Sequence, residues 1–212
     1  MKNEIKETKA YVDEFQSCMR GILKTIGSVP IGSKDQFPFG WRKAAKGRTV
    51  WRLLEEIISQ NLEVSAAKLG LLDFQANQSE VGVYDFEFRF KNSPKIYVNI
   101  KSAIKGGRSN KDDISKAPSL YSFVDDRRPC ILFVTTVEIV FCEQPLCIEL
   151  ADCYTVPVSW LPDIYVNPSN NGNLQSSKYK FIEEATPRTT EEFLVVLARE
   201  IEVARAKRAR KG

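Results

Sequence analysis

Histidine is absent from the 212-residue chain, and its absence excludes several kinds of catalytic site. Ser–His and Cys–His nucleophile pairs need an imidazole, and so do zinc sites with histidine ligands. Any catalysis by this chain must therefore use carboxylates, lysine, metal-bound water or a cysteine that acts without histidine.

Cysteine is scarce and lacks the spacing of a metal or redox motif. The cysteines are odd in number, form no CxxC pair and lie in part within apolar runs: Cys18, Cys130, Cys142, Cys147 and Cys153. This pattern is typical of buried free thiols in a reducing compartment. Apolar runs of transmembrane length are also missing, and the polar start MKNEIKETK is not that of a signal peptide. We therefore expect a cytoplasmic protein.

The bulk composition is that of an ordinary globular protein, with 43% hydrophobic and 27% charged residues. A chain of this length is expected to form one domain, 1–212, with a proper core. The net charge is only +4, but the positive charge is clustered. Basic residues dominate three segments, at 34–52, 101–111 and 205–211. Such clusters favour a nucleic-acid partner, although each can also be a solvated face.

The most informative stretch is 83–102, where VYDFEFRF and KIYVNIKS flank the break KNSP. Two runs rich in aromatic and β-branched residues around such a break predict a β-hairpin. Alternation gives each strand one apolar face and one polar face. Pairing Phe90 with Lys95 puts Asp85 opposite Ile100, so we expect a carboxylate, an amide and an ammonium group to gather on the polar face.

Hydrophobic periodicity predicts the other regular elements. Helices are expected at 2–26, 48–60 and 119–126, and strands at 71–75 and 130–141. A last helix, capped by Thr189 or Thr190, is expected to reach Val203 or beyond. Segments without a sustained period are expected to be loops, at 28–47, 102–118 and 167–180.

The hairpin carries a recognisable motif. Asp85 on one strand and Asn99-Ile100-Lys101 on the next resemble the PD-(D/E)xK nuclease superfamily, with an amide at the second acidic position. The predicted order of elements is also similar to the core of that superfamily. The resemblance implies an α/β fold with a restriction-endonuclease-like α-β-β-β-α-β core, in which helices flank a mixed central sheet. It further implies a Mg²⁺-dependent phosphodiesterase. Asp85, Asn99 and the Ile100 carbonyl would hold the metal, Lys101 would lie beside the attacking water, and Glu55 would join them from the preceding helix.

A second resemblance concerns DNA contacts. Segment 167–180 resembles the late Gly/Asn/Gln-rich recognition segment of small type II restriction enzymes, which a helix opening with Arg-Thr and Glu-Glu follows. Amide and hydroxyl groups can contact base edges, and basic groups can contact phosphates. We expect DNA contacts from this segment, from the first loop and from the loop after the hairpin: Asn171, Asn173, Gln175, Ser176, Ser177 and Lys178; Lys34, Trp41, Arg42, Lys43 and Lys46; Lys105 and Arg108.

These features predict a type II site-specific endodeoxyribonuclease acting on double-stranded DNA with Mg²⁺. Cutting both strands of a palindrome needs two sites related by two-fold symmetry, so we expect a homodimer, and no membrane association. Within the domain, 1–46 holds the N-terminal helix and a DNA-proximal loop, 47–141 the catalytic core, and 142–212 the recognition elaboration and last helix. Three alternatives stay open: a repair or junction-resolving nuclease of the same fold, a DNA-binding relative that has lost catalysis, for which Asn99 is the main sign, and a role unrelated to nucleic acid.

Overall fold

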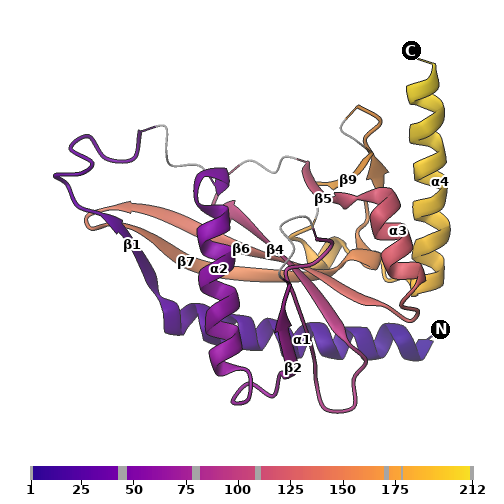
Figure 1. The fold of residues 1–212 in the computed structure, drawn as a ribbon, viewed down its shortest axis with the longest axis horizontal. Coiled ribbons are helices and arrows are strands. Elements are labelled where there is room, and N and C mark those ends of the chain that lie inside the picture. The colour runs from indigo at the N-terminus through magenta and orange to yellow at the C-terminus, as the bar shows by residue number, and fades with distance from the viewer. Residues whose placement is uncertain are drawn as a thin grey trace.

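The computed structural model describes residues 2–42, 47–77, 82–107, 111–169, 172–177 and 179–210 (Figure 1). Its α-helices are α1 (Lys2–Ile26), α2 (Gly47–Ser65), α3 (Ala117–Asp125) and α4 (Thr190–Ala209). Its strands are β1 (Ser28–Gly32), β2 (Leu72–Ala76), β3 (Phe86–Arg89), β4 (Ile96–Ile104), β5 (Asp112–Lys116), β6 (Ile131–Glu143), β7 (Leu146–Pro157), β8 (Tyr165–Val166) and β9 (Asn173–Ser176). Short 3₁₀ turns are η2 (Val158–Trp160) and η3 (Ile182–Glu184). Across these described ranges, no helix is both long and apolar enough to span a membrane.

The main sheet has the strand order β1-β7-β6-β4-β3-β2. β4 and β6 run parallel, whereas the other neighbours are antiparallel, so the sheet is mixed. A smaller antiparallel sheet has the order β5-β9-β8. The chain passes through α2, β2, β3, β4, α3 and β6 in that order, with β5 added before α3. The predicted α/β class, with a restriction-endonuclease-like core of a mixed sheet flanked by helices, is therefore confirmed.

Helices cover both faces of the main sheet (Figure 1). On one face, α1 packs across β7 and β3 and α2 packs against β4, and the rings of Phe15 and Phe88 stack with centroids 5.0 Å apart. On the other face, α3 and α4 pack against β4 and β6, and Tyr97 belongs to this second core. Burial of aromatic side chains on both faces fixes which side chains of β4 point to which helix pair.

The register of the β3–β4 hairpin differs from the predicted one. Phe86 lies opposite Val98, so the predicted pairing of Phe90 with Lys95 is wrong by one residue. Directly opposed residues of antiparallel strands point to the same face, and a buried phenylalanine therefore needs an apolar partner. The observed register brings the start of β3 to Val98, whose carbonyl accepts the backbone N–H of Asp85 at 2.7 Å.

Strands β1, β5 and β9 lie in segments that were predicted to be loops. Each is short, and each finds its partner far along the chain: β1 pairs with β7, and β5 pairs with β9. Short strands that are rich in polar residues, such as β5 and the central β9, or that contain a proline, such as the edge strand β1 with Pro30, carry no clear alternation. The predicted helices are present, although α2 continues past residue 60 to Ser65. Thr189 caps α4 through a capping box with Glu192.

Candidate active site

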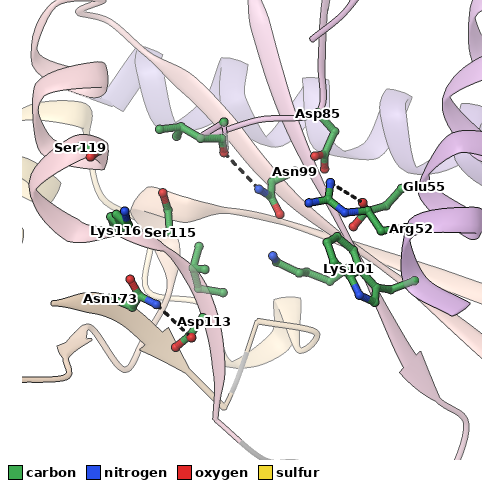
Figure 2. A pocket seen from close by; sticks show the side chains of 14 residues that line it. Arg52, Glu55, Asp85, Asn99, Lys101, Asp113, Ser115, Lys116, Ser119 and Asn173 are labelled. Atoms are coloured by element: carbon green, nitrogen blue, oxygen red, sulfur yellow. Dashed lines mark hydrogen bonds and ion pairs between the residues drawn. The ribbon is translucent and has the colours of Figure 1, made fainter. Parts of the chain in front are cut away.

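A cleft of about 410 Å³ lies where β4, β5, β9 and the starts of α2 and α3 meet (Figure 2). Three of the elements that line it belong to the predicted core, and β5 and β9 belong to the small sheet. The lining residues are Trp51, Arg52, Glu55, Gly82, Val83, Asp85, Asn99, Lys101, Asp113, Ile114, Ser115, Lys116, Ser119 and Asn173. The structure therefore brings together the predicted side chains of Asp85, Asn99, Lys101 and Glu55.

Asp85 directly precedes β3, at the point where the regular pairing of β3 with β4 ends. Its backbone N–H bonds to Val98, and its carboxylate Oδ2 accepts the backbone N–H of Ile100 at 2.6 Å. The N–H and C=O of a strand residue point to the same edge of the strand. The carbonyl of Ile100 therefore lies on the edge that Asp85 occupies, which suits the predicted pair of oxygen donors.

Asn99 carries a buried oxygen without a partner. The side chain is only 7% exposed, and its Nδ2 donates to the Val83 carbonyl at 3.1 Å. Because Nδ2 is held by that bond, Oδ1 points away from Val83, and Figure 2 shows it on the cleft side. Among the described residues, this Oδ1 has no hydrogen-bond partner. A buried acceptor left unpaired costs about 1–3 kcal/mol, so the position favours a cation or a donor.

Glu55 comes to the cleft from α2. Its side chain is 14% exposed and lies 3.9 Å from the Arg52 guanidinium, whereas the next residue, Glu56, is exposed and bonds to Gln60. Burial raises the pKa of Glu55 to about 8, and the charge of Asp85 adds to this, against the opposing charges of Lys101 and Arg52. Two carboxyl groups thus share one poorly solvated site.

Burial also raises the pKa of Asp85. The N–H of Ile100 and the positive charges of Lys101 and Arg52 act in the opposite direction. Bringing a cation to this pair would relieve both the desolvation and the mutual repulsion of the two carboxylates.

The donor set fits a hard divalent cation. Asp85, Glu55 and Asn99 offer only oxygen, and Mg²⁺ is usually held by one or two carboxylates together with waters and substrate phosphates. Within the part of the chain that the structure describes, no cluster of three or more His, Cys, Asp or Glu side chains could hold a metal alone. A metal here would therefore depend on the amide, a backbone carbonyl and oxygens from water or substrate.

Not every predicted DNA contact lies at the surface. Trp41 is 6% exposed, and its Nε1 donates to the Cys142 carbonyl at 2.7 Å. The prediction that it contacts DNA is therefore wrong: the indole is a packing residue of the loop. Lys34, Arg42 and Lys105 are exposed and do not line the cleft, and Arg42 stacks on Phe39. Five further predicted contacts lie outside the described residues: Lys43, Lys46, Arg108, Asn171 and Lys178.

The predicted base readers of segment 167–180 are held by the protein itself. Asp113 accepts hydrogen bonds from Asn173 at 3.0 Å and from Gln175 at 2.7 Å. Ser176 is fully buried and donates to Asp163, so its predicted base contact is corrected to a structural role. Ser177 donates to Asp163 as well, at 3.0 Å. Base contacts from Asn173, Gln175 and Ser177 stay predictions.

Several lining residues were missed by the sequence reasoning. Arg52 lies three residues before Glu55 on the same helix face, a spacing that could have indicated it. Asp113, Ser115 and Lys116 gave no comparable signal, because β5 was expected to be a loop, and nothing in the sequence of the two helices marked Trp51 or Ser119.

The chain matches no protein-family model and no curated protein. Among solved structures, it is similar to an NlaIV restriction endonuclease over 75% of each chain, with a TM-score of 0.43 and 11% sequence identity.

Proposed function

We propose that this protein is a Mg²⁺-dependent endonuclease that cuts double-stranded DNA at specific sites. The observation that carries the proposal is the meeting of Asp85, Glu55 and Lys101 around the unpaired Asn99 oxygen in one cleft. Two carboxyl groups and an oriented amide oxygen can hold a metal ion that polarises a phosphodiester, and an ammonium group can stabilise the negative charge that develops.

Each residue has a distinct part in this proposal. Asp85, the Asn99 oxygen and Glu55 would hold Mg²⁺, with the Ile100 carbonyl on the same strand edge. Bound there, Mg²⁺ would polarise the phosphate and offset the negative charge that develops during hydrolysis. The Lys101 ammonium group would bind the attacking water or a phosphate oxygen and stabilise the negative charge as the water loses its proton.

The carboxylate of Glu55 weakens the main argument for an inactive relative, which is the amide at Asn99. Asn99 removes one negative charge from the expected motif, but Glu55 supplies a carboxyl group beside Asp85. We therefore place an active nuclease ahead of a DNA-binding relative without catalysis. The proposed partner is a DNA duplex, and cleavage of both strands of a palindrome would be the work of a homodimer.

Cleavage of long DNA tests the proposal directly. Purified protein would be incubated with phage DNA, with and without Mg²⁺, and Asp85→Asn would be run beside it to exclude contaminating nuclease. Discrete bands that need both Mg²⁺ and Asp85 are the expected result. A smear would contradict site specificity. In a parallel assay, cleavage of a synthetic DNA junction but not of phage DNA would favour a junction-resolving enzyme. Intact DNA under all conditions, with binding retained, would leave only the DNA-binding relative.

A further inference from the structure

The C-terminal end of α4 carries positive charge that the proposed active site does not use. Arg205, Lys207 and Arg208 lie in its last two turns, and no acid occurs after Glu202 in the chain. Among the described residues, neither Arg205 nor Arg208 forms an ion pair. Cations at a helix C-terminus interact favourably with the helix dipole, but only within the last turn, which holds Lys207 and Arg208. The dipole therefore does not account for Arg205, which lies before the last turn.

Arg205 and Arg208 face a groove between α3 and α4. A cavity of about 280 Å³ is lined by Pro118, Ile201, Glu202 and Arg205, among others. A neighbouring cavity of about 130 Å³ shares Pro118, Ile201 and Arg205 and adds Arg208. Glu202 is the acid in this lining, against two arginines, so the groove is positively charged.

The groove and the active-site cleft are lined by neighbouring residues at the start of α3 and beside β9. Pro118 lines the groove, and its neighbour Ser119 lines the cleft. Gly172 likewise lines the groove, and its neighbour Asn173 lines the cleft. Lys116, which is exposed and lines the cleft, adds a further cation at the junction.

The arrangement of elements extends this positive surface. In the view of Figure 1, the end of α4, the start of α2 and the loop after β1 lie along the same side of the molecule. The start of α2 and the loop after β1 also carry basic residues, including Arg52 in α2 and Lys34 and Arg42 in the loop. A polyanion that crosses the cleft can therefore continue toward the end of α4.

We propose that the α3–α4 groove, through Arg205 and Arg208, binds the phosphate backbone of the same DNA duplex outside the cleft. Guanidinium groups are well suited to phosphate, and the groove lies beside the start of α3, which also borders the cleft. The contact is to backbone only, so it adds affinity at every sequence and leaves base discrimination unchanged. This inference rests on the proposed function, because it takes the DNA in the cleft as its ligand.

Salt-dependent binding tests the groove. Without Mg²⁺, so that no cleavage occurs, affinity would be measured for a long duplex and for one long enough only to fill the cleft. Each phosphate contact contributes about 0.9 to the slope of log affinity against log salt. We expect Arg205→Ala with Arg208→Ala to lower the slope by about 2 for the long duplex and to change nothing for the short one. The control is Lys207→Ala, because Lys207 lies in the same part of the helix but lines neither cavity. This variant should lower the slope much less than the double substitution does.

A measurement on the wild-type protein removes any dependence on how the variants fold. Uncharged methylphosphonate linkages in the flanks of the long duplex should weaken binding about as much as the double substitution, and the two losses should not add. Equal slopes for the wild type and the double variant, or full additivity, would overturn the inference and leave the proposed nuclease intact. Failure of the wild type to bind any duplex would overturn the inference, and the proposed function would fall with it only if phage DNA also stayed intact in the presence of Mg²⁺.

Discussion

The carboxylate of Asp85 accepts the backbone N–H of Ile100 at 2.6 Å, at the point where β3 begins. One side chain thus takes the place of the missing strand partner and, at the same time, presents its second oxygen to the cleft. The hydrogen bond fixes the carboxylate relative to β4, which carries Asn99 and Lys101. The local irregularity of the hairpin is therefore what sets the geometry of the candidate site.

Replacing Asp85 by asparagine separates two roles of this side chain: accepting the hydrogen bond from Ile100 and supplying negative charge. In Asp85→Asn, Oδ1 of the new amide can still accept the Ile100 N–H, but the charge that would attract Mg²⁺ is lost. We expect a folded protein whose cleavage is slower by about 100-fold or more, as when a charge-stabilising group is removed. Thermal unfolding and cleavage rates at several Mg²⁺ concentrations check this. A wild-type rate in this variant would show that Asp85 is not part of the catalytic machinery.

Lys101 should matter for the reaction and little for the fold. Lys101→Ala removes the ammonium group from the cleft, so the charge of the transition state is less well compensated, and cleavage should slow by about 100-fold. Lys105→Ala is the matched control, because Lys105 is exposed just beyond β4 and does not line the cleft. Single-turnover rates should separate the two variants, and equal losses in both would point to a general effect of positive charge.

Asn99→Asp restores the carboxylate of the usual motif. The new side chain cannot donate to the Val83 carbonyl, and it adds a third acid beside Asp85 and Glu55. Without Mg²⁺ we expect a loss of about 1 kcal/mol or more in the free energy of unfolding. Mg²⁺ should reverse the loss, because a ligand that binds only the native state stabilises it. Melting temperatures with and without Mg²⁺ check both steps.

Asn77→Asp is the control for this change. Asn77 also donates to a backbone carbonyl, that of Tyr84 at 2.9 Å, but it does not line the cleft. This variant should lose stability and gain nothing from Mg²⁺. If the wild type were inert and only Asn99→Asp cut DNA, the natural chain would be an inactivated nuclease, against the proposed function.

The parts of the fold that could be predicted are those with a strong local pattern. In α1 and β4, the positions buried against neighbours recur with the period of a helix or a strand. The apolar residues at those positions therefore show the same period in the sequence. Asp85, Asn99 and Lys101 could be placed together because they share two adjacent strands. Glu55 depended on the resemblance to the nuclease superfamily, because periodicity alone places it only beside the apolar stripe of α2.

The remaining parts depend on contacts between distant segments. The pairing of β5 with β9 joins residues 112–116 to 173–176, and neither segment alternates in hydrophobicity. The sequence therefore could not predict that Asp113 and Lys116 line the cleft. The prediction of the hairpin register failed for a different reason. Two pairings one residue apart differ only in which side chains share a face, and that rule alone decides between them.

The pH dependence of stability tests the unusual environment of Glu55. Its pKa is about 8 in the folded protein against an ordinary value of 4.5. The native state therefore holds a proton that the unfolded chain releases between these two pH values. Stability must fall as the pH rises through this window, by at most about 1.4 kcal/mol per pH unit for one group.

Glu55→Gln should remove that part of the pH dependence. Because solvent still reaches part of the site, we expect the variant to gain about 2 kcal/mol relative to wild type between pH 5 and pH 8, less than the full shift would give. Glu56→Gln, at an exposed position on the same helix, should follow the wild type. Mg²⁺ should flatten the wild-type curve, because it favours the ionised carboxylate, and should have little effect on Glu55→Gln. Chemical denaturation at each pH, with and without Mg²⁺, measures all three proteins, and parallel curves for the wild type and Glu55→Gln would show that Glu55 is not held in a poorly solvated acidic pair.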